Sequence, residues 1–583
     1  MVTDLPGRRS SAGGAAMMVL QRRTYPQVDP GAAELMHRSL AVCPAGASVR
    51  DALGLLRRRG LRLLVAHERN VAGVILPADL KRARALGLGS RRAEDVARWG
   101  SPVVSVRASE VTVRRALLAG APAVLVREGR RIVGAVEPAR GELGRPALSL
   151  LPRLERELPG ATLARLRRIG ATAEAMSARA YAVGGFVRDL RLGRQAAELD
   201  IAVEGDGLAL ARRLAEEWGG NLLVHRTFGT ATLEGGSGPR VDIATARRER
   251  YRTPGCLPDV TPASTEEDLA RRDFSVNAMA VALAPQRFGD LLDPLRGAAD
   301  LARRRLRILH PLSFVEDPTR ILRAARYQSR LGLTLDPASL RGLRLAIEVA
   351  PYPALSGQRL AAELELILAE PEGPRSLTTL GRWGGFRILD AAHRFSSRTA
   401  RRVAELGRLL DWLRRHAIAY DALPLGLLAL LASAPQDVAQ RGLKRLALAG
   451  EPLARLTAAL RDGPALAERL AREREAPPSG RAALMRERPL QSLAGAWLVG
   501  DAPARRQVEW FLSEGRTVHA LLGGDDLLAL GAARGPRMRE LLDRLRDCRL
   551  DGLARTREEE LALVRQWIGP AERRLRCQSN TSS

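Results

Sequence analysis

The chain has 583 residues, which is enough for roughly three to five domains, each with a core of its own. Its formal net charge is +28, and all but two of its 93 Lys and Arg residues are Arg, which suits bidentate contacts with the phosphates of a polyanion. An Ala- and Arg-rich chain can also reflect coding bias, but a cationic surface attracts nucleic acid in either case.

The cysteine pattern and the start of the chain exclude several classes of protein. Cys43, Cys256, Cys548 and Cys577 form no CxxC pair, which argues against a zinc site and a disulfide framework and is typical of a reducing, cytoplasmic compartment. We expect no membrane span, because no apolar run approaches twenty residues. The apolar patch within residues 1–34 is too brief for a signal peptide, so we interpret this segment as a disordered leader.

Residues 35–145 contain a weak internal repeat. The stretch "SVRDALGLLRRRGLRLLVAHERNVAGVILPADLKRA" (48–83) is echoed by "TVRRALLAGAPAVLVREGRRIVGAVEPARGEL" (112–143). Each copy predicts an amphipathic helix, an apolar strand, a turn, a second apolar strand and a short helix. The repeat resembles a tandem pair of CBS modules, a family that binds adenosine nucleotides between the two copies.

This resemblance implies at most one ligand-binding carboxylate in the pair. The family ends each copy with Gly, two apolar residues, Ser or Thr, and an Asp three residues further on. The first copy has Asp79 at the last position but Leu76 in place of the hydroxyl, and the second copy has Glu137 and Arg140 at these two places. We therefore favour a structural or homodimerising CBS pair without a ligand, and an adenine nucleotide bound through Asp79 is the alternative.

A Gly-Gly turn follows a predicted strand in "YAVGGFVRDLRLG" (181–193). Gly184 and Gly185 allow the backbone to approach a phosphate closely, and the N-terminus of the following helix favours an anion. Gly-Gly before a helix is common, so this signal alone is weak.

Three carboxylates occur on the next predicted strands. Glu198 and Asp200 are two residues apart in "ELDIAVEGDG" and therefore point to the same face of a strand, and Asp242 lies between apolar residues in "PRVDIATARRERY". Adjacent carboxylates repel one another unless a cation lies between them, so the pattern suits divalent metal and two-metal phosphoryl transfer. Each acid taken singly is more simply explained by an ordinary salt bridge.

Six ordered motifs connect these features to a family. They are GGFVRD, ELD, VDIATARRERY, EEDLARRDFSVNAMA, FGDLLDPLRGAADLARRRLRIL and EDPTRILRAARY. In this order and spacing they resemble the class II tRNA nucleotidyltransferases and the bacterial poly(A) polymerases over residues 163–368. The resemblance implies an α+β multidomain protein. After the α/β CBS pair we expect a polymerase-beta-like nucleotidyltransferase head with a mixed sheet (163–296), an all-α neck (297–370) and an all-helical, RNA-binding body and tail (371–583).

The resemblance also implies roles for single residues. Glu198, Asp200 and Asp242 would be catalytic and would hold Mg²⁺. Asp317 and Arg320 would read the edge of the incoming base, because a carboxylate accepts and a guanidinium donates hydrogen bonds at neighbouring positions i and i+3 of a helix. Arg323 and Arg326 continue that helix and would contact phosphates or RNA. The triphosphate and ribose would be bound by Gly184, Gly185, Arg188, Asp189, Arg271, Arg272, Asp273 and Asn277.

Two local features qualify these roles. Asp317 before a proline is also a good helix start, with the Asp as N-cap. Glu198 stands where the family has the first Asp of an Asp-x-Asp motif, and its extra methylene displaces the carboxylate by about an ångström, which can cost on the order of 100-fold in rate. Because the other motifs are kept, we expect an active enzyme rather than a pseudoenzyme.

We therefore expect template-independent nucleotidyl transfer to the 3′ end of tRNA, with Mg²⁺, ATP and release of pyrophosphate. The CBS pair ahead of the head, and the segment "RRERYRTPGCLPDVTPASTEEDLARRDF", resemble family members that add only the terminal A, although CTP as a further substrate stays open. Two alternatives remain. One is a poly(A) polymerase that acts on other RNAs, and the other is a non-catalytic RNA-binding protein that senses adenine nucleotides.

Overall fold

The computed structural model describes residues 31–68, 70–138, 148–195, 198–235 and 238–568. The described chain divides into two compact units. The first joins residues up to 38 with residues 102–137, and the second joins residues 39–101 with residues from 138 onward. None of the described helices is both long enough and apolar enough to cross a membrane.

The first unit is one half of the expected repeat. Its three-stranded sheet pairs β5 with β6 in parallel and β6 with β7 in antiparallel. Residues 1–30 of the expected leader lie outside the described residues, but the leader assignment is wrong for residues 31–34, because Ala32 is buried in the core of this unit. The elements are α1 (Ala32–Leu35), β5 (Val103–Ser105), α4 (Glu110–Leu118), β6 (Val124–Glu128) and β7 (Arg131–Val136).

The other half of the repeat opens the second unit and has the same pairing, with β1 parallel to β2 and β2 antiparallel to β3. Helix α2 begins at a capping box in which Ser48 and Asp51 exchange hydrogen bonds. We call this half, residues 39–101, the first module. Its elements are β1 (Leu40–Val42), α2 (Val49–Arg59), β2 (Leu63–Glu68), β3 (Val71–Ile75), α3 (Pro77–Ala85) and β4 (Arg98–Trp99).

The structure does not support the ribose-binding role considered for Asp79. This carboxylate is fully buried, and its two oxygens accept hydrogen bonds from Nε and Nη2 of Arg98 at 2.7 and 3.1 Å. A buried carboxylate that is paired in this way stabilises the module rather than presenting oxygens to a ligand.

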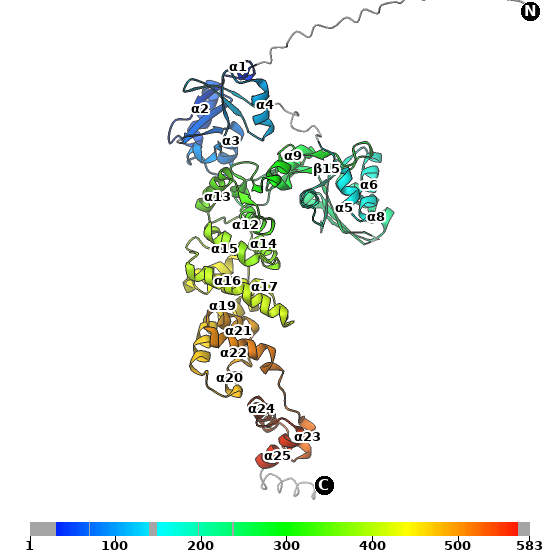
Figure 1. The fold of residues 1–583 in the computed structure, drawn as a ribbon, viewed down its shortest axis with the longest axis vertical. Helices are drawn as coiled ribbons and strands as arrows, with labels where there is room; N and C mark the ends of the chain where they lie inside the picture. Colours follow the sequence, from blue (N-terminus) through cyan, green and yellow to red (C-terminus); the bar gives the residue numbers. More distant parts are fainter. Residues whose placement is uncertain (1–30, 69, 139–147, 196–197, 236–237, 569–583) are drawn as a thin grey trace, which may run out of the picture. The chain divides into compact units, whose positions relative to one another are not determined.

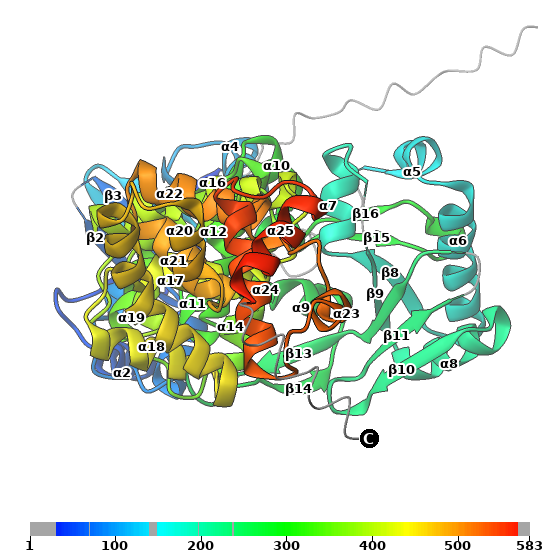
Figure 2. The same ribbon diagram turned by 90° about the horizontal axis from the view of Figure 1, so that it is seen from below.

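The head contains the expected mixed sheet. Its strands follow the order β10-β11-β12-β9-β8-β15-β16, in which β12 and β9 are parallel and the other neighbours are antiparallel. Helices α6 and α8 pack against this sheet (Figure 2). The strands are β8 (Arg179–Val183), β9 (Leu199–Glu204), β10 (Asn221–His225), β11 (Thr230–Glu234), β12 (Val241–Thr245), β15 (Ala280–Ala282) and β16 (Leu291–Leu292), and the helices are α5 (Leu151–Glu157), α6 (Gly160–Ala175), α7 (Gly185–Arg191) and α8 (Gly207–Trp218).

A two-stranded hairpin follows the seven-stranded sheet. Strand β13 (Arg247–Arg250) pairs in antiparallel with β14 (Asp259–Pro262). Helix α9 (Thr265–Ala270) then begins at a capping box formed by Ser264 and Glu267, and it leads into the Arg-Arg-Asp segment.

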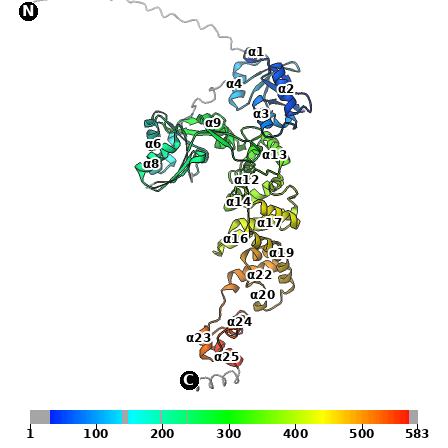
Figure 3. The same cartoon turned by 180° about the vertical axis from the view of Figure 1, so that it is seen from behind.

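The neck lies between the head and the body and is mainly helical, as expected. Helix α12 packs against α14 (Figure 3) and α15, and Asp336 caps the start of α13. Two short strands, which we did not expect in an all-α neck, pair in parallel. The elements are α10 (Gly297–Ala302), β17 (Arg305–Leu306), α11 (Ser313–Glu316), α12 (Thr319–Leu331), β18 (Thr334–Leu335), α13 (Pro337–Val349) and α14 (Gly357–Ala369).

The described residues from 371 to 568 form helices and turns and contain no strand, which agrees with the expected body and tail (Figure 1). The helices are α15 (Gly373–Arg382), α16 (Ser397–Arg415), α17 (Ala422–Leu431), α18 (Gln436–Arg445), α19 (Gly450–Arg472), α20 (Pro478–Met485), α21 (Leu490–Val499), α22 (Ala502–Ser513), α23 (Gly524–Ala529), α24 (Pro536–Leu550) and α25 (Arg557–Trp567).

Candidate functional site

The Gly-Gly turn lies against charged side chains of the head. Gly184 joins β8 to α7 with φ +70°, which a residue with a side chain rarely adopts. A Cβ on Gly184 would lie 2.8 Å from Nη1 of Arg272 and 3.5 Å from Oδ2 of Asp200. The absence of a side chain at Gly184 therefore allows the Arg272 guanidinium to approach the turn closely, next to the Asp200 carboxylate.

Asp200 and Asp242 are neighbours on parallel strands. The register of β9 and β12 places their Cα atoms directly opposite one another. Burial raises the pKa of the Asp200 carboxyl, the Arg272 guanidinium lowers it, and the negative charges of Glu198 and Asp242 raise it further, so that the net shift is upward. The carboxylate of Asp242 also accepts hydrogen bonds from Thr232 and Arg240.

The neighbouring carboxylates of Asp200 and Asp242 suit a divalent cation. Burial is the main reason that the pKa of Asp200 is raised, and the charges of Glu198 and Asp242 add to it, so a bound cation would favour the ionised carboxylate. Within the described ranges, no three His, Cys, Asp or Glu side chains converge as a ready-made metal cluster. Glu198 is exposed and precedes the first residue of β9, and its charge acts on Asp200 together with that of Asp242.

The sequence predicted that Arg188 and Asp189 bind the triphosphate, but in the structure both side chains contact other residues of the protein. Both are buried, and Arg188 donates hydrogen bonds from Nε and Nη2 to Asp189 at 2.8 Å and from Nη1 to Oδ1 of Asn277 at 2.7 Å. The Arg188 guanidinium also lies 5.2 Å from the ring centroid of Tyr327. These three polar residues thus join α7 to the neck helix α12 and position the turn rather than a ligand.

Asp268 holds the two arginines of the Arg-Arg-Asp segment. Its carboxylate accepts hydrogen bonds from Arg271 at 2.6 and 3.0 Å and from Arg272 at 3.0 and 3.3 Å. Burial opposes its ionisation, but Arg272 and Arg271 more than offset burial, and the pKa of Asp268 is lowered. The arginines are therefore fixed at one end, which reduces the entropy they lose when they bind a phosphate. Sequence reasoning missed Asp268, although it lies within the motif.

Asp273 connects this segment to α12. Its carboxylate accepts hydrogen bonds from Nε of Arg323 at 2.9 Å, from Nδ2 of Asn277 at 3.0 Å and from the backbone N–H of Phe274 at 2.7 Å. Burial would raise the pKa of Asp273, but Arg323, the Asn277 amide and Arg320 together lower it to about 2.

A pH dependence of stability follows from Asp273. Its pKa is about 2 in the folded protein, below the unfolded value of 3.8, so its stabilisation is complete above pH 4 and is lost as the pH falls towards 2. The loss amounts to about 2 kcal/mol. We expect the free energy of unfolding, measured with urea between pH 5 and pH 2, to fall more steeply in the wild type than in Asp273→Asn. Equal slopes would contradict the pairing.

The expected phosphate contacts of α12 are also different in the structure. Arg326 is buried, its guanidinium lies 5.4 Å from the ring centroid of Tyr327, and its Nε is 3.9 Å from Oε1 of Glu370. It is therefore not available to an RNA phosphate. Arg323 is partly exposed but divides its donors among Asp273, Glu363 and Tyr327. The periodicity of α12 predicts which residues share a face but not which acidic residues lie opposite them.

The expected base-reading pair lies at the junction of α11 and α12. Asp317 accepts hydrogen bonds at Oδ1 from Thr319 and from Nη2 of Arg359, the latter at 2.8 Å. Arg320 donates from Nη1 to the Ser313 hydroxyl at 2.6 Å and from Nη2 to the backbone carbonyl of Arg271 at 2.8 Å. Both side chains are thus held in place before any base arrives.

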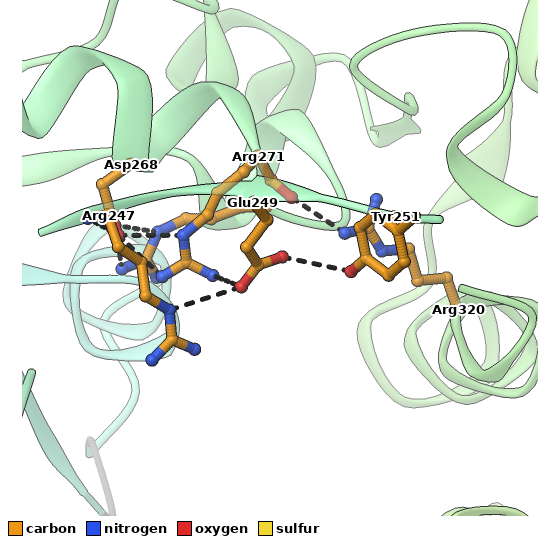
Figure 4. A network of polar contacts seen from close by, with 7 residues as sticks. Arg247, Glu249, Tyr251, Asp268, Arg271 and Arg320 are labelled. Carbon is orange, nitrogen blue, oxygen red and sulfur yellow. Dashed lines mark hydrogen bonds and ion pairs between the residues drawn. The ribbon is translucent and has the colours of Figure 1, made fainter. Parts of the chain in front are cut away.

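A network on the hairpin strand β13 supports the same site (Figure 4). Glu249 accepts hydrogen bonds at Oε1 from Nη1 of Arg271 at 2.7 Å and from Nε of Arg247 at 3.4 Å, and at Oε2 from the Tyr251 hydroxyl at 3.1 Å. Burial raises the pKa of Tyr251, which therefore stays a hydrogen-bond donor at neutral pH. Sequence reasoning missed Glu249 and Tyr251 as site residues, although the segment that contains them was singled out.

These side chains line a cavity of about 270 Å³ between the head and the neck. A larger cavity of about 390 Å³ lies elsewhere in the head, against Phe186, Leu190 and Glu198. None of the Arg and Asp residues described above lines it. The smaller cavity has the chemistry of a site for a polar, anionic ligand with one planar part. Its lining residues are Arg247, Glu249, Tyr251, Leu257, Pro258, Arg271, Arg272, Asp273, Asp317, Arg320, Arg323 and Arg359.

Known proteins are similar to the head and to part of the CBS repeat. Residues 180–307 match the poly A polymerase head domain, and residues 32–86 match the CBS domain. An A-adding tRNA nucleotidyltransferase of Halalkalibacterium halodurans is 31% identical over 429 residues, which cover 72% of this chain and 96% of that protein. A protein of the same name from Geobacter sulfurreducens is 31% identical over 586 residues and 91% of this chain, which spans 64% of that relative's length.

A solved structure shows the same architecture. The Thermotoga maritima CCA-adding enzyme complexed with tRNA superposes with a TM-score of 0.61 at 28% identity, over 72% of this chain and 99% of that one.

Proposed function

Because the chain belongs to the family of tRNA nucleotidyltransferases, we propose that it transfers AMP from ATP to the 3′ end of a tRNA that ends in CC, and that it releases pyrophosphate. The observation that carries this proposal is the cavity in which Arg271, Arg272 and Asp273 of the head meet Asp317 and Arg320 of the neck. Arginines suit the triphosphate, and the Asp–Arg pair suits the edge of a base.

The two ends of the cavity recognise different parts of ATP. Arg271 and Arg272 are held by Asp268 and present planar guanidinium groups, which bind phosphate oxygens in a bidentate manner. Asp317 accepts and Arg320 donates, so the pair matches a base edge that carries an amino group beside a ring nitrogen. Adenine and cytosine share that pattern, whereas uracil and guanine present a carbonyl group in place of the amino group.

The carboxylates of Asp200 and Asp242 would hold the divalent metal ion, which we propose to be Mg²⁺. When bound, the ion lowers the pKa of the attacking 3′-hydroxyl and stabilises charge on the leaving pyrophosphate. The protein's own contribution is to orient the two reactants. The turn at Gly184 lets Arg272 lie close to Asp200, so a phosphate bound by this guanidinium would lie near the carboxylate pair.

An incorporation assay tests this function. Three tRNA transcripts that end at the discriminator base, after C and after CC are offered with Mg²⁺ and with ATP, CTP or both. We expect one A to be added to the CC-ended transcript and nothing to the others. CCA built on the bare discriminator would make the protein a complete CCA-adding enzyme, and long A tails on an unstructured RNA would make it a poly(A) polymerase.

The glutamate at position 198 gives a second prediction. Because Mg²⁺ demands near-ideal octahedral geometry, a carboxylate on a side chain that is longer by one methylene is poorly placed near Asp200. We expect Glu198→Asp to increase the rate of AMP transfer in Mg²⁺ by about tenfold, and to increase it less in Mn²⁺. Glu198→Gln serves as the control for loss of charge. Lower activity of Glu198→Asp in both metals would show that the glutamate is correctly placed as it is, and equal activity would show that this side chain does not hold the metal.

A further inference from the structure

Helix α3 of the first module carries two charged residues whose contacts lead to the neck, Arg82 directly and Asp79 through Arg98. Asp79 and Arg82 are three residues apart and therefore lie on the same face of the helix. Leu80 and Ala83 of the same helix belong to the continuous hydrophobic core that also contains Phe314 and Val315 of α11. The first module and the neck thus share a core, and the polar contacts between them are placed by packing on both sides.

The contact of Arg82 is with Glu316, the last residue of α11. The Nε atom of Arg82 lies 2.9 Å from Oε1 of Glu316, whose side chain is only 9% exposed. The other carboxylate oxygen of Glu316 is 3.2 Å from Nε2 of His310. Burial, and next the charge of Arg82, lower the pKa of His310 to about 4, so this imidazole is neutral at pH 7. The guanidinium of Arg82 is therefore the charged group in direct contact with the buried Glu316 carboxylate.

A second contact from the same helix reaches the same segment. Asp79 fixes the guanidinium of Arg98 through two hydrogen bonds. The remaining Nη1 of Arg98 points to the backbone carbonyl of Leu309 at 3.4 Å. Asp79, which the sequence suggested as a ribose ligand, therefore orients Arg98 toward the neck. The contact is made at Leu309, a few residues before α11.

Glu316 is adjacent to the segment from Asp317 to Arg320, which we call the base-reading turn. It directly precedes Asp317, and its backbone carbonyl accepts a hydrogen bond from the N–H of Gly255 at 3.0 Å. Arg359 donates to the carbonyl of Gly255 at 3.1 Å and to the Asp317 carboxylate at 2.8 Å. The loop after β13, the turn at Asp317 and helix α14 are thus linked through backbone and side chain, and a shift of Glu316 would be transmitted to Asp317.

We propose that Arg82 of the first CBS module is a positioning residue for base selection, which acts by holding the Glu316 carboxylate and through it the Asp317–Arg320 turn. This inference rests on the proposed function and deepens it. In this account the module has a role in nucleotide choice without binding a nucleotide itself. Removal of Arg82 leaves a buried carboxylate beside a neutral histidine, and such a carboxylate is expected to move toward solvent and to take the turn with it.

The other ion pairs between the module and the neck provide matched controls. Arg91 pairs with Glu348 of α13 at 3.2 Å, and Arg341 pairs with Glu68. The Arg91 and Glu348 side chains are more exposed than Glu316, and neither belongs to the base-reading turn. Arg91→Ala therefore removes a contact of the same kind between the same two parts without touching that turn.

The test compares kcat/KM for ATP and GTP on CC-ended tRNA in the full-length wild type, Arg82→Ala, Arg82→Lys and Arg91→Ala. For Arg82→Ala we expect the ratio of the ATP constant to the GTP constant to fall about tenfold, mainly through the KM for ATP. Arg82→Lys is expected to restore most of the ratio, and Arg91→Ala to leave it at the wild-type value. Hydrogen exchange of the amides from 316 to 321 is expected to accelerate only in Arg82→Ala.

Three results would overturn the inference. They are an unchanged ratio in Arg82→Ala, an equal fall of both constants in that variant, and the same fall in Arg91→Ala. If Arg82→Ala does not fold, Glu316→Gln replaces it, because the neutral amide no longer needs the cation. Arg82→Gln added to Glu316→Gln should then have no further effect on the ratio, and an additional loss would contradict the coupling. A wild type that incorporates neither nucleotide would refute the proposed function itself, which separates the two failures.

Discussion

Asp200→Asn is expected to reduce the rate of AMP transfer by about 10³-fold or more while leaving the folded protein at least as stable as the wild type. The first effect follows from the register that places Asp200 opposite Asp242, since an amide supplies one weak oxygen in place of a charged carboxylate. The second follows from the raised pKa of Asp200. A carboxyl that burial and the charges of its neighbours make harder to ionise destabilises the folded state at neutral pH, and the neutral amide removes that cost.

The measurement combines single-turnover AMP transfer to CC-ended tRNA with thermal unfolding in the presence of EDTA. Asp206→Asn is the matched control, because Asp206 follows the same strand and only caps α8 by accepting a hydrogen bond from the N–H of Ala209 at 2.9 Å. We expect that variant to keep both its rate and its melting temperature. If Asp200→Asn melted well below the wild type, the residue would have a structural role, and the loss of activity would carry no information about metal binding.

Asp317→Asn is expected to lower kcat/KM for ATP by about 100-fold without affecting the binding of tRNA. The carboxylate is held by Arg359 at 2.8 Å and would accept a hydrogen bond from the amino group of the base. An Asn of the same shape rotates to offer its oxygen to Arg359 and then presents an N–H to the base, so a donor faces a donor. A site built to pair with a polar group loses more when that group is mismatched than when an apolar contact is removed.

Steady-state kinetics with each of the four nucleotides checks this second prediction. Asp336→Asn is the control in the neck, where Asp336 caps α13 by accepting a hydrogen bond from the N–H of Ser339 at 2.8 Å. The wild-type order of nucleotides is expected to persist in Asp336→Asn and to flatten in Asp317→Asn. An ATP constant within threefold of the wild type in Asp317→Asn would show that the base is read elsewhere.

The sequence was sufficient for the architecture and indicated which segments contain the candidate site. Glu198, Asp200 and Asp242 were singled out because they were predicted to lie on strands, where periodicity fixes which side chains share a face. The parallel pairing of β9 and β12 places the last two residues opposite one another, whereas Glu198 precedes β9. The repeated helix–strand–strand pattern likewise predicted both CBS modules, which show the same order of parallel and antiparallel pairing.

The polar partners of the site could not be found from the sequence. Arg188 was expected to contact a phosphate, but in the structure it pairs with the adjacent Asp189 and with Asn277, which is distant in sequence. Glu249 lies on a short strand whose polar residues give no strong periodic signal. Such pairs depend on which elements meet in three dimensions, and local patterns carry no information about that.

The contacts of the first module show the same limit. Asp79 fits the end of a CBS signature, and nothing in its neighbourhood along the chain indicates that Arg98 occupies it. Glu316 belongs to the motif that was recognised, yet its partner Arg82 comes from a different part of the chain. Sequence patterns therefore predicted what kinds of residues the site contains, whereas the structure shows which residues hold them in place.

The measurement that tests the central claim most directly is the ratio of kcat/KM for ATP to that for CTP on tRNA ending in CC, with Mg²⁺ and the wild-type chain. We expect ATP to be preferred by about 100-fold or more and the product to be longer by a single A. Comparable constants for the two nucleotides, or a product that continues to grow, would contradict the addition of one terminal A.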